Sequence, residues 1–134
     1  MMLGIGDVRD LIAGLGITDN DHVYCGKLDD KKDKSVGVYH LNRTSNVRMA
    51  IGGIQNSSYD VKPISALVHW NKSVRDTEKV AQTLYDKLRD IKEERINGTK
   101  ILFTEMLVSA PVDVDTDDKG IYERVIELNF YYER

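Results

Sequence analysis

The chain has 134 residues and a formal net charge of -3, from 19 basic and 22 acidic residues. This balance argues against a protein that mainly binds phosphate backbones, because such binding draws on a basic excess. The length suits one hydrophobic core, so we expect a single domain over residues 1–134. The single cysteine, Cys25, excludes an intramolecular disulfide and a four-thiolate zinc site, and no apolar run is long enough for a membrane span.

The first part of the chain predicts a helix and then two strands. Apolar residues recur at helical spacing from Leu3 to Leu15, and Gly16 marks the end of the helix. The runs "HVYCGKL" (22–28) and "SVGVYHL" (35–41) flank the charged stretch "DDKKDK". Two strand-like runs around a polar turn predict a hairpin with a charged tip at residues 29–34.

Residues 42–58, "NRTSNVRMAIGGIQNSS", are polar at both ends and apolar in the middle. We predict a short strand over residues 47–51 inside a long loop, and a mobile arm is the alternative. Loops of this length tend to carry function.

The segment "YDVKPISALVHW" (59–70) predicts a central strand, with Pro63 at an end that lies on the sheet edge. Ser73, followed three residues later by Asp76, resembles a capping box for the longest helix. One apolar stripe marks the face of that helix that must lie on the sheet: Val80, Ala81, Leu84, Leu88 and Ile91.

The rest of the chain predicts two strands. Asn97 and Gly98 form a turn into "KILFTEMLVSA" (100–110), which is apolar on both faces and is predicted to be interior. Residues 111–120 read as an acidic loop. The final strand alternates, with apolar residues at most even positions from Tyr122 to Tyr132 and with Glu123, Glu127 and Asn129 at odd positions. One face is therefore covered, and the other is open to water or to a partner.

Three patterns in the sequence suggest chemistry, and each has a simpler structural explanation. Asp113, Asp115 and Asp117 alternate as in a calcium loop, but the loop glycine and the final glutamate are missing, so we predict no metal site there. A nucleic-acid patch around Arg43, Arg48, Tyr59 and Lys62 is the second pattern, and the acidic excess argues against it.

The histidines and the cysteine form the third pattern. His22, His40 and His69 are predicted to be structural or surface residues, because no carboxylate stands at a spacing that would orient them. Cys25 is predicted to be a small packed side chain. We therefore expect no catalytic residues, no cofactor and no metal.

Several phrases in the chain resemble a known family. "AIGG", then "YDVKPISALVHWNKSVRDTEKVAQTLYDKL" and the closing "GIYERVIELNFYYER", are similar to the minor capsid and tail-terminator proteins of bacteriophages with long non-contractile tails. The resemblance implies an α/β (α+β) fold, in which two helices pack on one face of a curved, mixed and mostly antiparallel sheet of about five or six strands.

The resemblance also implies a non-enzymatic role in the virion. Six copies would form a homohexameric ring that caps the tail tube, ends its polymerisation and joins the tail to the head connector. The implied partners are the chain itself, the tail tube protein and a head-completion or connector protein. DNA would pass through the lumen without specific binding, no membrane would be involved, and assembly would take place in the bacterial host cytoplasm.

The candidate interface residues come from two regions. One is the apolar middle of the long loop, and the other is the polar face of the last strand: Val47, Arg48, Met49, Ile51, Glu123, Glu127 and Asn129. The alternatives are a small α/β ligand-binding or enzymatic domain that uses the open sheet face, a nucleic-acid accessory protein, and a head-tail connector protein that acts at the adjacent ring.

Overall fold

The computed structural model describes residues 3–26, 33–41 and 59–133. The strand predicted over residues 47–51 lies outside this part of the chain, and so does most of the charged tip predicted at residues 29–34.

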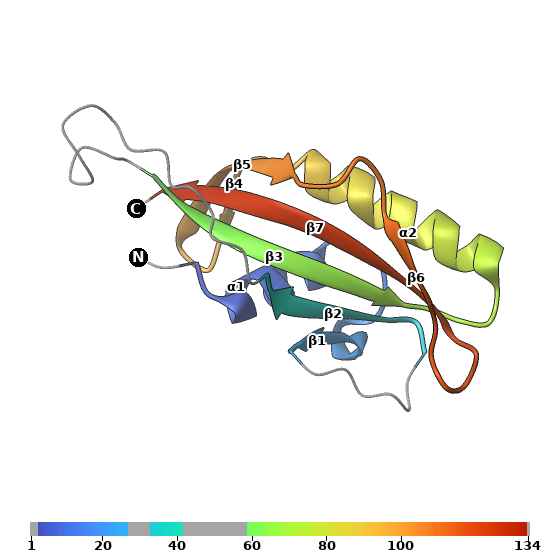
Figure 1. The fold of residues 1–134 in the computed structure, drawn as a ribbon. Helices are drawn as coiled ribbons and strands as arrows, with labels where there is room; N and C mark the ends of the chain where they lie inside the picture. The colour runs from blue at the N-terminus through green and yellow to red at the C-terminus, as the bar shows by residue number, and fades with distance from the viewer. Residues whose placement is uncertain (1–2, 27–32, 42–58, 134) are drawn as a thin grey trace.

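Two α-helices, one 3-10 helix and seven strands make up the described chain (Figure 1). In chain order they are α1 (Ile5–Gly14), η1 (Asn20–His22), β1 (Val23–Cys25), β2 (Ser35–His40), β3 (Tyr59–His69), α2 (Val74–Arg89), β4 (Lys92–Ile96), β5 (Thr99–Met106), β6 (Val112–Thr116) and β7 (Tyr122–Glu133). The strands form one sheet in the order β1-β2-β3-β7-β5-β4, and β6 pairs with β7 beyond the end of β5. The predicted α+β class with a mixed, mostly antiparallel sheet is confirmed.

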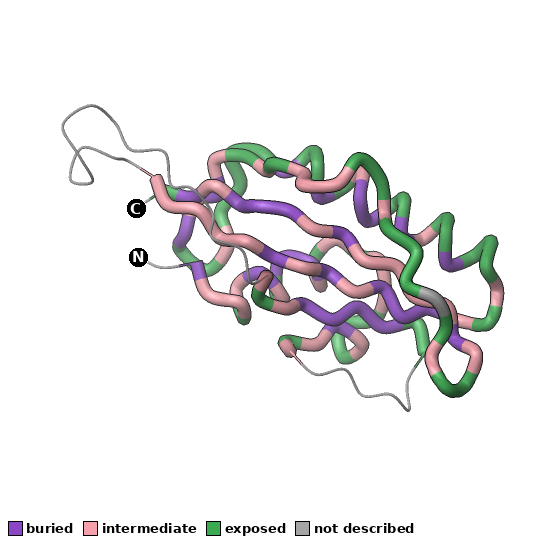
Figure 2. Tube along the Cα trace, in the orientation of Figure 1, coloured by how far each residue is buried: buried purple, intermediate pink, exposed green. Residues whose placement is uncertain are grey.

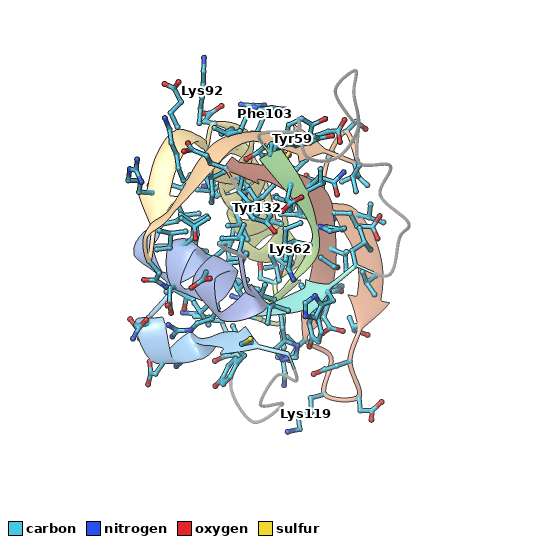
Figure 3. All side chains as sticks on the ribbon, turned by 90° about the vertical axis from the view of Figure 1, so that its left-hand side faces the viewer. Tyr59, Lys62, Lys92, Phe103, Lys119 and Tyr132 are labelled. Carbon is cyan, nitrogen blue, oxygen red and sulfur yellow. The ribbon has the colours of Figure 1, made fainter. Side chains whose placement is uncertain are left out.

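The sheet curls around the two helices (Figure 3). Helix α2 packs on β7, β5 and β3, whereas α1 contacts β1 and β2 at one edge and β4 at the other. The Asn97 side chain, in the turn between β4 and β5, donates hydrogen bonds of 2.9 Å to Asp7 and Asp10 of α1. The bond from Asn97, together with one from Arg9, lowers the pKa of Asp10. These bonds tie the far edge of the sheet to the first helix, so the helices fill the concave side.

The core lies between the helices and the concave face. Even-numbered residues of β3 and β7 point inward, and Ile64, Ala66, Ile126, Leu128 and Phe130 are fully buried. The alternation is visible along β3 and β7 in Figure 2. Burying apolar side chains contributes about 25 cal/mol per Å² of area removed from water, so this face dominates the folding free energy. The predicted alternation of the last strand is confirmed.

Helix α2 begins as predicted. The Ser73 hydroxyl accepts a hydrogen bond of 3.2 Å from the Asp76 backbone N–H, which satisfies one of the free donors of the first turn. Its inner face buries Ala81, Leu84 and Leu88, as the stripe predicted.

Pro63 also lies where the sequence predicts. Strand β2 ends at His40, opposite Ile64, so the earlier residues of β3 pair only with β7. The Pro63 carbonyl accepts from the Leu41 N–H on the β2 side. Because N–H and C=O of one strand residue point to the same side, the N–H that proline lacks would face Leu41, just beyond the end of β2, and the ladder to β7 loses no bond.

The predicted hairpin of residues 22–41 is wrong. Strands β1 and β2 are parallel, with Val23 opposite Val36 and Cys25 opposite Val38. Strand β1 has only three residues and spans about 10 Å, so the chain can return over that distance within residues 26–34.

Two strands of the sheet escaped prediction. Strand β4 has the sequence KEERI and is exposed over Lys92–Arg95, so it carries no apolar signal. Strand β6 lies within the predicted acidic loop and pairs with β7 from Val112 to Thr116. Both strands are held by backbone pairing rather than by buried side chains.

Candidate functional site

The convex face of the sheet carries no helix in the described part of the chain (Figure 1). It is formed by the odd-numbered residues of β3 and β7, which stand opposite one another in the antiparallel register. Glu123, Glu127 and Asn129 lie on this face. The other candidate interface residues, Val47, Arg48, Met49 and Ile51, lie outside the described residues.

This face is more apolar than its acids suggest. Leu67 stands opposite Val125, and Val61 stands opposite Tyr131, and all four are half-buried. The sequence reading noted the acids of β7 but did not consider the apolar residues that β3 brings beside them. The face is therefore a mixed surface of the kind found at protein interfaces.

Three aromatic side chains gather at the end of this face nearest the chain termini. The ring of Phe103 on β5 stacks on Tyr131, with centroids 4.4 Å apart and planes at 14°. Tyr131 also contacts Tyr59 of β3 at 5.6 Å. With Leu102 and Glu105 these rings line a shallow pocket of about 290 Å³. We call Tyr59, Phe103 and Tyr131, together with Glu105, the aromatic patch; Tyr59 and Phe103 are labelled in Figure 3.

A hydrogen-bond network fixes the patch from below. Glu105 Oε1 accepts a bond of 2.9 Å from the Asn129 amide and one of 3.0 Å from the Tyr131 hydroxyl. Asn129 is only 8% exposed, although it belongs to the predicted polar face. Its other amide atom, Oδ1, is buried and has no hydrogen-bond donor among the described residues. An unsatisfied buried acceptor is costly, so this atom is a place where a donor would be stabilised.

A β-bulge explains why Phe103 belongs to the patch. Ile101 pairs with Tyr132 and is fully buried, whereas Phe103 pairs with Tyr131 and is 46% exposed. The register shift between these two residues turns the strand, so that residues two apart point to opposite faces. The prediction that residues 100–110 are interior on both faces is therefore wrong.

His69 is the second polar centre on the convex face. It is 3% exposed, its Nδ1 lies 3.0 Å from Glu123 Oε2, and its Nε2 lies 3.6 Å from Asp117 Oδ2. The prediction that no carboxylate orients a histidine is wrong, because Glu123 stands directly opposite His69 in the β3–β7 register. The sequence separation of 54 residues hid this pair.

Asp117 shapes the turn between β6 and β7. Its Oδ1 accepts hydrogen bonds of 2.9 Å from the backbone N–H groups of Lys119 and Ile121. Burial alone raises the pKa of Asp117, but these bonds and the charges of His69 and Lys119 outweigh it and lower the pKa. This aspartate of the rejected calcium loop thus caps a turn.

The remaining candidates for chemistry are dispersed. His22 Nδ1 lies 3.1 Å from the Asp33 carbonyl oxygen, and His40 is exposed at the end of β2. Asp19, Asp21 and His22 have potential ligand atoms within 4.8 Å of one another, but exposed acidic groups are often found in this way without an ion. Cys25 is exposed, so its prediction as a packed side chain is wrong.

The described half of the suggested nucleic-acid patch is not assembled. Tyr59 lies on the convex face, whereas Lys62 lies inside the curl with Tyr132 (Figure 3). Burial lowers the pKa of Lys62. Arg43 and Arg48 lie outside the described residues.

A larger open hollow of about 730 Å³ runs along the outer side of α2. The described residues that line it all come from this one helix and include Arg75, Glu78, Lys79 and Asp86. A ligand-binding domain is expected to converge polar groups from several elements, and this hollow does not do so.

Comparison with known families decides the class of protein. A family model described as bacteriophage tail terminator protein matches residues 3–134. The chain belongs to the bacteriophage tail terminator family. No curated protein and no solved structure matches it significantly.

Membership in the tail terminator family gives the chain a role in phage tail assembly and makes it a component of the virion tail that interacts with other tail components. The resemblance noted in the sequence is confirmed. The family is structural, in keeping with the expected non-enzymatic role. Neither α1 nor α2, the α-helices of the described chain, has the length and apolarity that a membrane-crossing helix needs.

Proposed function

We propose that this tail terminator protein caps the tail tube as a homohexameric ring, stops tube polymerisation and then joins the tail to the head connector as a minor component of the head-tail junction. The observation that carries the proposal is the convex face, where half-buried apolar residues and an exposed phenylalanine remain on a sheet whose other face is already filled by helices. A monomer has no need of such a surface, but a subunit of an assembly does.

A ring of identical chains requires two different, complementary patches on each copy. The convex face, with Glu123, Glu127 and Asn129, supplies the first patch in this proposal. The loop residues Val47, Arg48, Met49 and Ile51 supply the second, on the next copy or on the tube protein. Residues 42–58, to which they belong, contain two arginines and no acidic residue, and so complement the acidic residues of the convex face.

The proposal also covers the lumen. The chain is acidic overall, and acidic groups around a central channel repel phosphates, so DNA passes without being held. The partners proposed are the tail tube protein and a head-completion protein, and assembly takes place in the host cytoplasm.

Sedimentation of the purified protein with and without tail tubes tests this function. We expect a hexamer at high concentration or on tube ends, and tubes whose length stays constant after the protein is added. A chain that remains strictly monomeric and leaves tube growth unchanged would contradict the proposal.

A further inference from the structure

We infer that the aromatic patch receives an arginine side chain from residues 42–58 of a second copy of this chain. This inference rests on the proposed ring and goes further, because it names the surface, the occupant and the chemistry that joins them.

The patch has the chemistry of a guanidinium site. The faces of Phe103, Tyr131 and Tyr59 attract a cation placed over them. The Glu105 carboxylate lies at the rim and supplies the opposite charge. The buried Asn129 Oδ1 beneath the patch has no donor among the described residues, and a guanidinium offers several N–H donors in a fixed fork.

The patch is also organised before it binds. Glu105 already holds both the Asn129 amide and the Tyr131 hydroxyl, and Phe103 already stacks on Tyr131. Binding of a ligand therefore requires little further ordering of these side chains, and the entropic cost of that ordering is small. The bulge that turns Phe103 outward leaves this ring 46% exposed, which has no benefit for the isolated subunit.

The occupant is argued from charge and position. Residues 42–58 contain Arg43 and Arg48 and no acidic residue. Glu133, next to Arg134, stands opposite Tyr59 and adds a second carboxylate near the patch. The segment ends immediately before Tyr59, so the arginine donor and the patch lie at the same end of each subunit. In a ring, the donor of one copy can therefore reach the patch of the adjoining copy.

Two matched substitutions test the site. Phe103 and Val74 are both 46% exposed, but Val74 lies at the start of α2 on the helix side of the sheet, whereas Phe103 lies in the patch. We expect Phe103→Lys to weaken self-association roughly thirtyfold or more, as loss of an aromatic anchor typically does, and Val74→Lys to leave it unchanged. Equal association of the two variants, measured by sedimentation velocity, would overturn the inference while leaving the ring itself intact.

A mixing experiment tests the occupant. The Phe103→Lys chain keeps its segment 42–58, and a chain with Arg43→Glu and Arg48→Glu keeps its patch. Each variant alone should be monomeric, and their mixture should form dimers that do not grow into rings. A mixture that stays monomeric while the wild-type chain associates would overturn the inference.

A peptide of residues 42–58 separates the two proposals. It should shift the ring resonances of Tyr59 and Tyr131 in the Val74→Lys chain and leave those of the Phe103→Lys chain unchanged. If the wild-type chain neither self-associates nor binds tail tubes, the proposed ring is wrong. If the peptide also fails to bind, the inference about the aromatic patch is wrong as well. Altered Tyr131 shifts in the dilute Arg43→Glu and Arg48→Glu chain would show that the segment binds its own subunit, which also contradicts the inference.

Discussion

Phe130 and Tyr131 are neighbours in β7, but their side chains lie on opposite faces of the sheet and have different roles. Phe130 is fully buried among the helices, whereas Tyr131 is half-buried on the convex face, where it contacts two other aromatic rings. The concave face closes one subunit, and the convex face leaves ordered aromatic and polar groups at the surface. Strand β7 thus separates folding from assembly by pointing alternate residues to opposite faces of the sheet.

The largest expected effect lies on the concave side. Phe130→Ala should lower the free energy of unfolding by about 3–5 kcal/mol, because it leaves a cavity in the core. Tyr131→Ala should cost only about 1 kcal/mol, the order of one aromatic pair contact, while it weakens self-association. Urea denaturation and sedimentation of both variants check this. Similar losses of stability would break the distinction between the faces.

His69 is the exception on the convex side, because it is almost fully buried there. His69→Gln should lower the free energy of unfolding by about 1–3 kcal/mol, since it leaves Glu123 and Asp117 without their shared partner. Ser65→Ala, on the same strand and face, serves as the control and should change little. If the two variants unfold at the same urea concentration, His69 does not hold the β6–β7 turn.

Glu105 tests whether the convex network serves assembly more than folding. Glu105→Ala should destabilise the subunit by about 1 kcal/mol, because the Asn129 amide and Tyr131 hydroxyl lose their acceptor. Glu105→Gln keeps an acceptor and should preserve stability, yet it removes the charge that attracts a cation. We expect both variants to associate more weakly by sedimentation. Full association of Glu105→Gln would show that the charge is not needed.

The smallest effect concerns pH. The pKa of Asp117 is lowered in the folded chain, so its ionised form contributes stability above the unfolded pKa, and this contribution is lost as pH falls through the folded value. The amide resonances of Lys119 and Ile121 should therefore move together below about pH 4. Asp117→Asn keeps the acceptor oxygen and should abolish the titration. Unchanged movement in that variant would assign it to another group.

The sequence predicted the elements whose side chains are buried on one side. The stripe of α2, the Ser73 cap and the alternation of β7 were confirmed, because each depends on residues close together in the chain. Strand β4 offered no such pattern: its residues Lys92–Arg95 are exposed, and only pairing with β5 makes it a strand.

The site was harder to predict than the fold. The position of Glu123, Glu127 and Asn129 on one face follows from a period of two. Burial of Asn129 and the contact of His69 with Glu123 depend on partners 24 and 54 residues away. The aromatic patch depends in addition on a bulge at Leu102, which no composition or periodicity reveals.

The bond from Asn97 to Asp7 has a consequence for synthesis of the chain. The two residues are 90 positions apart, and Asn97 is residue 97 of 134. Residue 97 must therefore leave the ribosome before α1 gains this anchor, and until then the amino-terminal helix can contact β1 and β2 but not the turn after β4. The amino-terminal helix thus reaches its final contacts only after the turn that follows β4 has been synthesised.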